Sequence, residues 1–276
     1  MSSNPRNAVN LSDLAPRIAS AVVMAALALG TAWFGDRVYI IFWLAVSAAI
    51  FWEWTQIVAP DARLKFAIGA VALAAIAPAI AGGAILYAVL ILAVAMGLLA
   101  GLPSTRRLWH TLGLLYAASL LMATIMLRFS FPLGLPAIFW LFAVVWGTDV
   151  MAYFGGRFIG GPKLWPRVSP SKTWSGFLTG IFSGALLGLL IGAQVDMPVW
   201  PIFLLGLVTG AVAQGGDLLE SSFKRHFGVK DASNLIPGHG GFMDRLDGFL
   251  AAAVFACIFG ALRAGIFDPA NGLLAW

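Results

Sequence analysis

Residues 221–248 read SSFKRHFGVKDASNLIPGHGGFMDRLDG, and they lie between two apolar runs, VWPIFLLGLVTGAVAQ at 199–214 and FLAAAVFACIFGALRA at 249–264. The polar segment contains four Lys or Arg residues, three Asp residues and two His residues. Polar groups placed against hydrocarbon are unfavourable unless they are paired or hydrated. A dense polar cluster between two lipid-compatible runs therefore indicates a functional site in a membrane protein.

The composition of the whole chain is that of an integral membrane protein. Of 276 residues, 61% are hydrophobic and 11% are charged, whereas soluble domains have about 25% charged residues. Apolar runs near 20 residues favour helices, and helices satisfy the backbone hydrogen bonds that lipid cannot. We therefore expect an all-α fold, a polytopic membrane helix bundle.

The apolar runs predict about nine transmembrane helices. They lie at 18–34, 39–57, 66–80, 85–102, 112–127, 135–154, 177–193, 199–214 and 249–264. Residues 1–134 then form a set of N-terminal helices, and residues 135–250 form a half with two polar loops, 155–175 and 215–248. Nothing resembles a second soluble domain, so residues 1–276 are expected to form a single integral membrane domain.

The distribution of Lys and Arg predicts the orientation. If the N-terminus lies in the cytoplasm, only Arg37, Arg128 and Arg263 of the 17 Lys and Arg residues fall outside, which leaves 14 inside. Short cytoplasmic loops are enriched in these residues. We therefore expect a multi-pass protein of the cell inner membrane or plasma membrane, with both polar loops facing the cytoplasm.

Two pairs of acidic residues predict a metal site. Asp217 with Glu220, and Asp244 with Asp247, are three positions apart, which places each pair on one face of a helix. Neighbouring carboxylates repel each other unless a cation lies between them, and oxygen ligands suit magnesium better than zinc. We therefore expect these two acidic pairs to converge on a bound Mg²⁺ ion.

The same loop contains groups that suit a polyphosphate. Lys224, Arg225 and Lys230 supply positive charge, and Gly240 and Gly241 are expected to present backbone N–H groups to an anion. A plainer alternative is a loop whose cations only reflect membrane orientation. The acidic residues at the membrane boundary favour a polyphosphate site, because orientation alone does not explain them.

The first polar loop has a similar character. Its SPSKT element, residues 169–173, places the hydroxyl of Ser169 near Lys172, a combination that suits phosphate. The glycines of this loop fit neither a P-loop nor a dinucleotide fingerprint. Asp149 lies inside an apolar run, where an unpaired carboxylate is costly. It is expected either to form a buried ion pair or to contribute to the ion site.

Two further features lie inside apolar runs. Glu53 is near the inner end of the second run, and we expect its side chain to extend towards the membrane surface. Gly180, Gly184 and Gly188 recur every four positions in the run 177–193. Small residues at this spacing allow close helix contact, and their face is a candidate seam for a homodimer.

An ordered set of residues extends through the last polar loop: Ser221, Phe223, Lys224, Arg225, Lys230, Asp231, Ser233, Ile236, Pro237, His239, Gly240, Gly241, Phe242, Asp244, Arg245, Leu246 and Asp247. This set resembles the full signature of phosphatidate cytidylyltransferases, also called CDP-diacylglycerol synthases. The upstream residues that are similar to another motif of that family are Asp149, Tyr153, Gly156, Arg157 and residues 169–173. The resemblance covers about residues 135–250, and it departs from the family at Ser175, where an acidic residue is common.

The resemblance implies that CTP and phosphatidic acid react to give CDP-diacylglycerol and pyrophosphate in phospholipid biosynthesis. It also implies Mg²⁺ at a site on the cytoplasmic membrane face, and it leaves open whether a second cation such as K⁺ takes part. We expect the site to be walled by the sixth to ninth apolar runs, and no nucleic acid to be a partner. The resemblance implies that Asp217, Asp244 and Asp247 are catalytic residues that bind Mg²⁺. The other expected catalytic residues are Lys224, Arg225 and His239, and the expected substrate-binding residues are Ser169, Lys172, Ser221, Lys230, Gly240, Gly241 and Arg245.

Three alternatives remain from the sequence. A CDP-alcohol phosphotransferase would use a DxxDGxxAR motif, but the arginine that should follow Asp244, Asp247 and Gly248 is absent. A lipid or prenol kinase would use the same charges with another acceptor. An organic-anion transporter would need cations near the middle of its membrane spans, whereas this chain has nearly all of its cations in loops.

Overall fold

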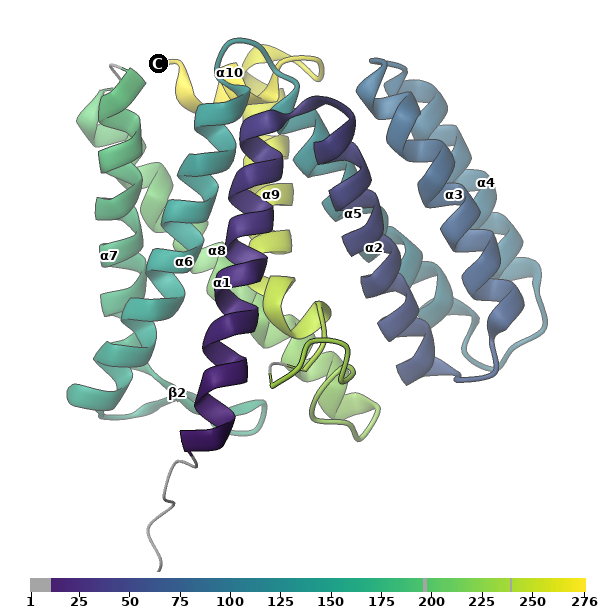
Figure 1. Cartoon of the computed structure of the whole chain (residues 1–276), viewed down its shortest axis with the longest axis horizontal. Coiled ribbons are helices and arrows are strands. Elements are labelled where there is room, and N and C mark those ends of the chain that lie inside the picture. The colour runs from purple at the N-terminus through teal and green to yellow at the C-terminus, as the bar shows by residue number, and fades with distance from the viewer. Residues whose placement is uncertain (1–10, 196–197, 239) are drawn as a thin grey trace, which may run out of the picture.

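The computed structural model describes residues 11–195, 198–238 and 240–276. In chain order the elements are α1 (Leu11–Phe34), α2 (Asp36–Val58), α3 (Arg63–Ala81), α4 (Ile85–Gly101), α5 (Arg107–Arg128), α6 (Gly134–Phe158), β1 (Lys163–Trp165), β2 (Ser169–Thr173), α7 (Trp174–Gly192), the 3-10 helix η1 (Ala193–Val195), α8 (Val199–His226), α9 (Met243–Ala264) and α10 (Pro269–Leu274). The long helices stand side by side, with α3 and α4 at one edge of the bundle and α7 at the other (Figure 1).

The membrane-type helix bundle predicted from the apolar runs is confirmed, because each run lies in a helix of its own. Among the described residues, seven helices are long and apolar enough to cross a membrane: α2, α3, α5, α6, α7, α8 and α9. The other two apolar helices, α4 and the part of α1 at Ile18–Phe34, are shorter.

Both polar loops are shorter than predicted, because the helices continue past the apolar runs. Helix α6 ends at Phe158, α8 extends to His226, and α9 begins at Met243, so the second loop is reduced to a connection at 227–242. The first loop contains an antiparallel hairpin, in which β1 pairs with β2. Hydropathy marks where a chain becomes polar, which is not where the helical hydrogen bonds end.

The glycines of α7 form the close helix contact that their spacing predicts, but the contact is with α6 of the same chain. A Cβ atom at Gly184 would lie 2.2 Å from Thr148 Oγ1 and 2.5 Å from the Val144 carbonyl oxygen. A Cβ atom at Gly180 would lie 2.7 Å from the Thr148 carbonyl oxygen, and one at Gly188 would lie 2.8 Å from Val144 Cγ2. The prediction that this face is a dimer seam is therefore wrong, because α6 covers it.

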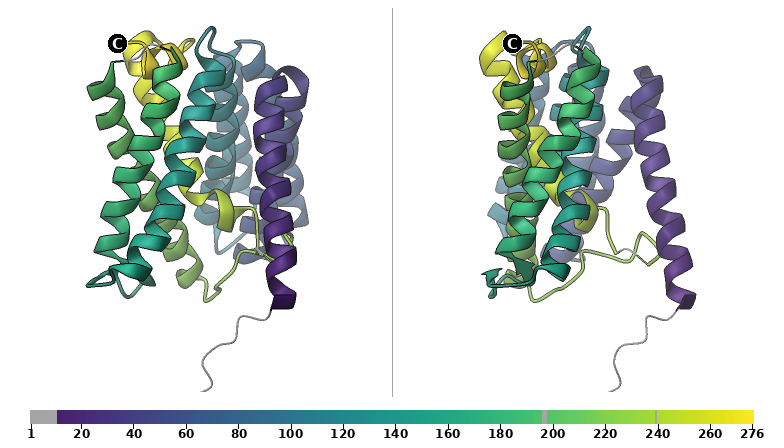
Figure 2. Two further views of the ribbon diagram at one scale, coloured as in Figure 1. Left: turned by 60° about the vertical axis from the view of Figure 1, so that its left-hand side comes forward. Right: turned by 90° about the vertical axis from the view of Figure 1, so that its left-hand side faces the viewer.

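The polar segments gather at one end of the bundle. The β1–β2 hairpin, the connection 227–242 and the start of α1 lie at this end, and the C-terminus lies at the other (Figures 1 and 2). The connection also reaches α1, where Ser20 Oγ donates a hydrogen bond of 3.2 Å to the Pro237 carbonyl oxygen. This common end is where the acidic and basic residues of the two motifs can meet.

We predict that Gly184→Ala lowers the stability of the protein, because the new methyl group would force α7 away from α6. Overpacking of this kind costs about 1–3 kcal/mol. Gly97→Ala is the matched control, since a Cβ atom at Gly97 in α4 has no atom within 4 Å. Thermal unfolding in detergent measures both variants. Equal unfolding temperatures for the two variants would contradict the assigned α6–α7 contact.

Candidate functional site

A cavity of about 620 Å³ lies at the polar end of the bundle. Its walls come from α6, the β1–β2 hairpin, α7, α8, the connection 227–242 and the start of α9. The charged residues that line it are Asp149, Arg157, Lys172, Asp217, Lys224, Asp231, Asp244, Arg245 and Asp247. Helices α6 to α9 all contribute to these walls, but the α9 residues that line the cavity, Asp244, Arg245 and Asp247, precede the ninth apolar run at 249–264. Acidic and basic groups are both present, as a site for a metal and a phosphate requires.

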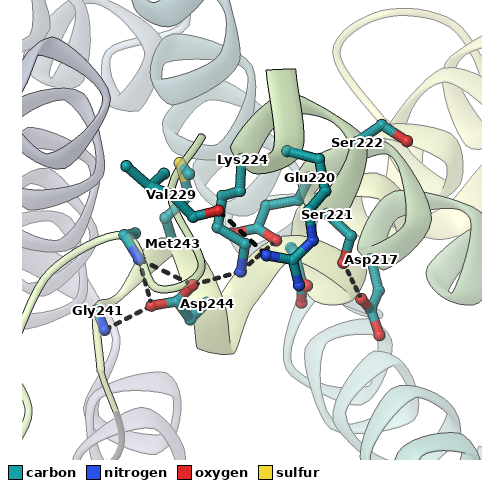
Figure 3. Close-up of polar contacts among 12 residues, drawn as sticks. Asp217, Glu220, Ser221, Ser222, Lys224, Val229, Gly241, Met243 and Asp244 are labelled. Carbon is teal, nitrogen blue, oxygen red and sulfur yellow. Dashed lines mark hydrogen bonds and ion pairs between the residues drawn. The ribbon is translucent and has the colours of Figure 1, made fainter. Parts of the chain in front are cut away.

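Lys224 is the centre of the buried charges in this cavity. Its Nζ lies 2.6 Å from Asp244 Oδ1 and 2.8 Å from Glu220 Oε2 (Figure 3). The side chains of Lys224, Asp244 and Glu220 are 11%, 6% and 2% exposed. Glu220 and Lys224 are both on α8, and Asp244 is on α9, so this group of charges joins the two helices. Removing one partner would leave another charge buried without compensation.

Asp244 also organises the connection 227–242. Its Oδ2 accepts hydrogen bonds from the backbone N–H groups of Ala232 at 2.9 Å and Gly241 at 2.8 Å. Gly241 was predicted to present its N–H to a phosphate, and this prediction is wrong because that N–H donates to Asp244 inside the protein. The Asp244 carboxylate already has Lys224 and two backbone donors as partners. We therefore assign it to holding the connection against α9.

The two polar motifs meet at Lys172 and Asp217. Lys172, on β2, has its Nζ 2.6 Å from Asp217 Oδ2 and 3.0 Å from Gln214 Oε1. On the other side of the carboxylate, Ser221 Oγ donates a hydrogen bond of 3.3 Å to Asp217 Oδ1 (Figure 3). The lysine of the SPSKT element therefore lies against the helix that carries the longer motif. This contact brings the first polar loop and the end of α8, which are distant in sequence, together at one cavity.

Three other carboxylates of the cavity are oxygen ligands of the kind that magnesium prefers. Asp149, Asp217 and Asp247 line the same space, and Asp247 Oδ1 accepts a 2.7 Å hydrogen bond from the Gly248 N–H. Within the described parts of the chain, no three Asp, Glu, His or Cys residues form a ready-made ion cage. Magnesium does not need one, because it is commonly held by one or two carboxylates, water and substrate phosphates. Asp217 and Asp247 suit this role better than Asp244.

Six of the twelve predicted site residues that the structure describes line the cavity. Those that line it are Lys172, Asp217, Lys224, Asp244, Arg245 and Asp247. The predicted residues that do not line it are Ser169, Ser221, Arg225, Lys230, Gly240 and Gly241. Arg225 is exposed, and its Nη1 donates a 3.3 Å hydrogen bond to the Val229 carbonyl oxygen. His239 lies outside the described residues.

Two residues of the site region were missed from the sequence. Gln214 ends the eighth apolar run and is 4% exposed, yet its side chain accepts a hydrogen bond from Lys172. Glu53 was expected to extend towards the membrane surface, and this is wrong because its side chain is fully buried and bound to the connection 227–242. In both cases, the position of a polar residue inside an apolar run could have indicated a buried polar contact.

The residues that line the cavity also lie within the part of the chain that is similar to known proteins. Residues 15–262 match the Cytidylyltransferase family, and this range includes every residue that lines the charged cavity. The chain belongs to this family. It is accordingly an enzyme, a nucleotidyltransferase.

Three similar proteins are all phosphatidate cytidylyltransferases. A phosphatidate cytidylyltransferase of Brucella abortus is 40% identical over 259 residues, which cover 92% of this chain and 96% of that protein. A phosphatidate cytidylyltransferase of Staphylococcus epidermidis is 48% identical over 119 residues, or 42% of this chain and 46% of that protein. One of Staphylococcus aureus is 45% identical over the same length. The similarity to the Brucella protein also covers the N-terminal helices, which lie outside the motif resemblance at residues 135–250.

We predict that Lys224→Met destabilises the protein by about 3–5 kcal/mol, because it leaves Glu220 and Asp244 buried without a cation. The matched control is Lys230→Met on the same polar segment, where the side chain is exposed. Denaturant titration in detergent measures the free energy of unfolding of both variants. If Lys224→Met lost no more stability than Lys230→Met, the buried ion pairs would not hold α8 against α9.

Proposed function

We propose that this enzyme transfers a cytidylyl group from CTP to phosphatidic acid, giving CDP-diacylglycerol and pyrophosphate. The observation that carries the proposal is the ion pair between Lys172 and Asp217, which unites both polar motifs in one charged cavity. The cavity, at about 620 Å³, has the size of sites that hold small ligands, about 300–1,000 Å³. The name of the Brucella relative, which is similar over 92% of the chain, supports the choice of substrates.

The reaction needs alignment and charge neutralisation more than proton transfer. A phosphate monoester oxygen of the lipid attacks the α-phosphorus of CTP, the bond between the α- and β-phosphates breaks, and pyrophosphate leaves. A phosphate monoester has a second pKa of about 6, so the nucleophile is already an anion near neutral pH. No side chain has to act as a general base.

The residues of the cavity divide into two roles in this proposal. Asp217 and Asp247 would hold magnesium, which when bound neutralises charge on the α-phosphate and on the leaving pyrophosphate. Lys172 and Arg245 would hold phosphate oxygens by charge-assisted hydrogen bonds. Lys172 is already oriented by Asp217 and Gln214, so less freedom is lost when the substrates bind.

We also propose that all nine long helices cross the membrane and that the polar end faces the cytoplasm. The excess of Lys and Arg on this side supports the orientation. Phosphatidic acid would then enter from the inner leaflet and CTP from the cytoplasm. The two substrates would meet at the depth of the lipid headgroups.

Orientation is tested with single-cysteine variants, because the chain has one cysteine, Cys257. In a Cys257→Ala background, we expect Lys230→Cys to react with a membrane-impermeant thiol reagent only in inside-out vesicles. Ala275→Cys, near the opposite end, is expected to react only in right-side-out vesicles. Both positions are exposed. The reverse pattern would place the polar end outside and contradict the proposal.

The activity is tested with purified protein in detergent, supplied with CTP, Mg²⁺ and phosphatidic acid. We expect pyrophosphate and CDP-diacylglycerol in equal amounts. Parallel assays test the alternatives. Transfer of the γ-phosphoryl group of CTP to an added prenol, with release of CDP, would instead identify a kinase. Release of CMP from CDP-diacylglycerol and an added alcohol would identify a CDP-alcohol phosphotransferase. Absence of pyrophosphate from protein that still binds CTP would contradict the proposed function.

In the same assay, we predict that Asp217→Asn and Asp247→Asn each lower the rate by about 100-fold or more, the scale for losing one electrostatic group of a reacting centre. The magnesium concentration for half-maximal rate should rise in both variants. Asp61→Asn is the control, because Asp61 is exposed in the turn between α2 and α3. If both cavity variants required the same magnesium concentration as the wild type, Asp217 and Asp247 would not be metal ligands.

A further inference from the structure

Glu53 accepts three hydrogen bonds from the signature segment although it belongs to the N-terminal helix α2. Its Oε1 accepts from Ser233 Oγ at 2.6 Å and from the Phe242 N–H at 2.8 Å. Its Oε2 accepts from the Met243 N–H at 2.7 Å. The side chain is 0% exposed, so water does not compete for these donors.

These bonds supply a cap that α9 does not provide for itself. The first N–H groups of any helix have no partner within the helix, and a side-chain oxygen at the preceding position commonly accepts from them. In α9 that position is Phe242, whose side chain makes no cap hydrogen bond. Glu53 provides the missing acceptor from another helix, and its negative charge is favourable at a helix N-terminus.

The same contacts fix the aspartates of the cavity. Met243, one of the donors, directly precedes Asp244, and Asp247 follows one turn later on the same helix. Gly241 lies between the two carboxylates: its N–H donates to Asp244 at 2.8 Å, and a Cβ atom there would lie 2.5 Å from Glu53 Oε1. Figure 3 shows the hydrogen bond from Gly241 to Asp244, and the short distance to Glu53 means that a side chain at Gly241 would not fit without a shift.

We propose that Glu53 is a positioning residue for cytidylyl transfer, through which the N-terminal half of the chain fixes Asp244 and Asp247 at the cavity. The inference rests on the proposed function for its reaction. Glu53 does not line the cavity, so it acts through α9 and not on the substrates. A carboxylate is required because all three partners are donors, and only an ionised acid accepts with both oxygens and donates with neither.

The experiment compares Glu53→Ala, Glu53→Gln and the control Gln56→Ala, one helical turn away on α2, in the full-length protein in detergent. We expect Glu53→Ala to lower kcat about 100-fold, the effect of a shift of about 1 Å in a reacting group. Glu53→Gln retains one oxygen acceptor and should restore kcat about tenfold relative to Glu53→Ala. The KM for CTP should change less than kcat in both, and Gln56→Ala should match the wild type.

Hydrogen exchange supplies a readout that does not depend on activity. In Glu53→Ala, the amides of Phe242 and Met243 should exchange at least about tenfold faster, while exchange in α3–α7 stays unchanged. A kcat within twofold of wild type, or faster exchange spread over the whole chain, would overturn the positioning role. If wild-type protein released no pyrophosphate, the proposed function would fail, whereas local exchange at these two amides would still support the contact.

Discussion

The buried ion pairs of Lys224 are the interaction on which the polar end of this molecule depends. An ammonium group and two carboxylates with almost no exposure can be tolerated only when they form ion pairs with one another. Because Glu220 and Lys224 are on α8 and Asp244 is on α9, these ion pairs also fix the two helices together. Asp244 then binds the backbone of the connection 227–242, and Glu53 binds it from the opposite side.

In the proposed site, some carboxylates have a structural role and others are offered to the metal ion. Asp244 and Glu53 have their oxygens occupied by donors of the protein, and they determine the path of the backbone. Asp217 and Asp247 face the cavity with fewer partners, beside Lys172 from the hairpin. The signature is therefore long because it specifies both a scaffold and the groups that the scaffold presents. The N-terminal helices belong to this scaffold, since they supply Glu53.

The sequence predicted the helices and most of the cavity, because membrane spans and unpaired charges leave strong local signals. It did not predict where α8 ends, since a helix continues into polar residues once one face lines a cavity. It also placed Gly241 wrongly, because the partner of a backbone N–H depends on the folded connection. The role of Glu53 was missed for a related reason: its partners lie 180 to 190 residues further along the chain. Spacing alone carries no information about such contacts.

The most direct test of the account is the position of a metal ion relative to the two motifs. Crystals grown with Mn²⁺ and a non-hydrolysable CTP analogue would reveal it through anomalous scattering. We expect one peak in contact with carboxylate oxygens of Asp217 and Asp247, with the triphosphate beside Lys172. A peak bound to neither aspartate, with the nucleotide outside this cavity, would contradict the central claim that the two motifs form one metal-dependent site.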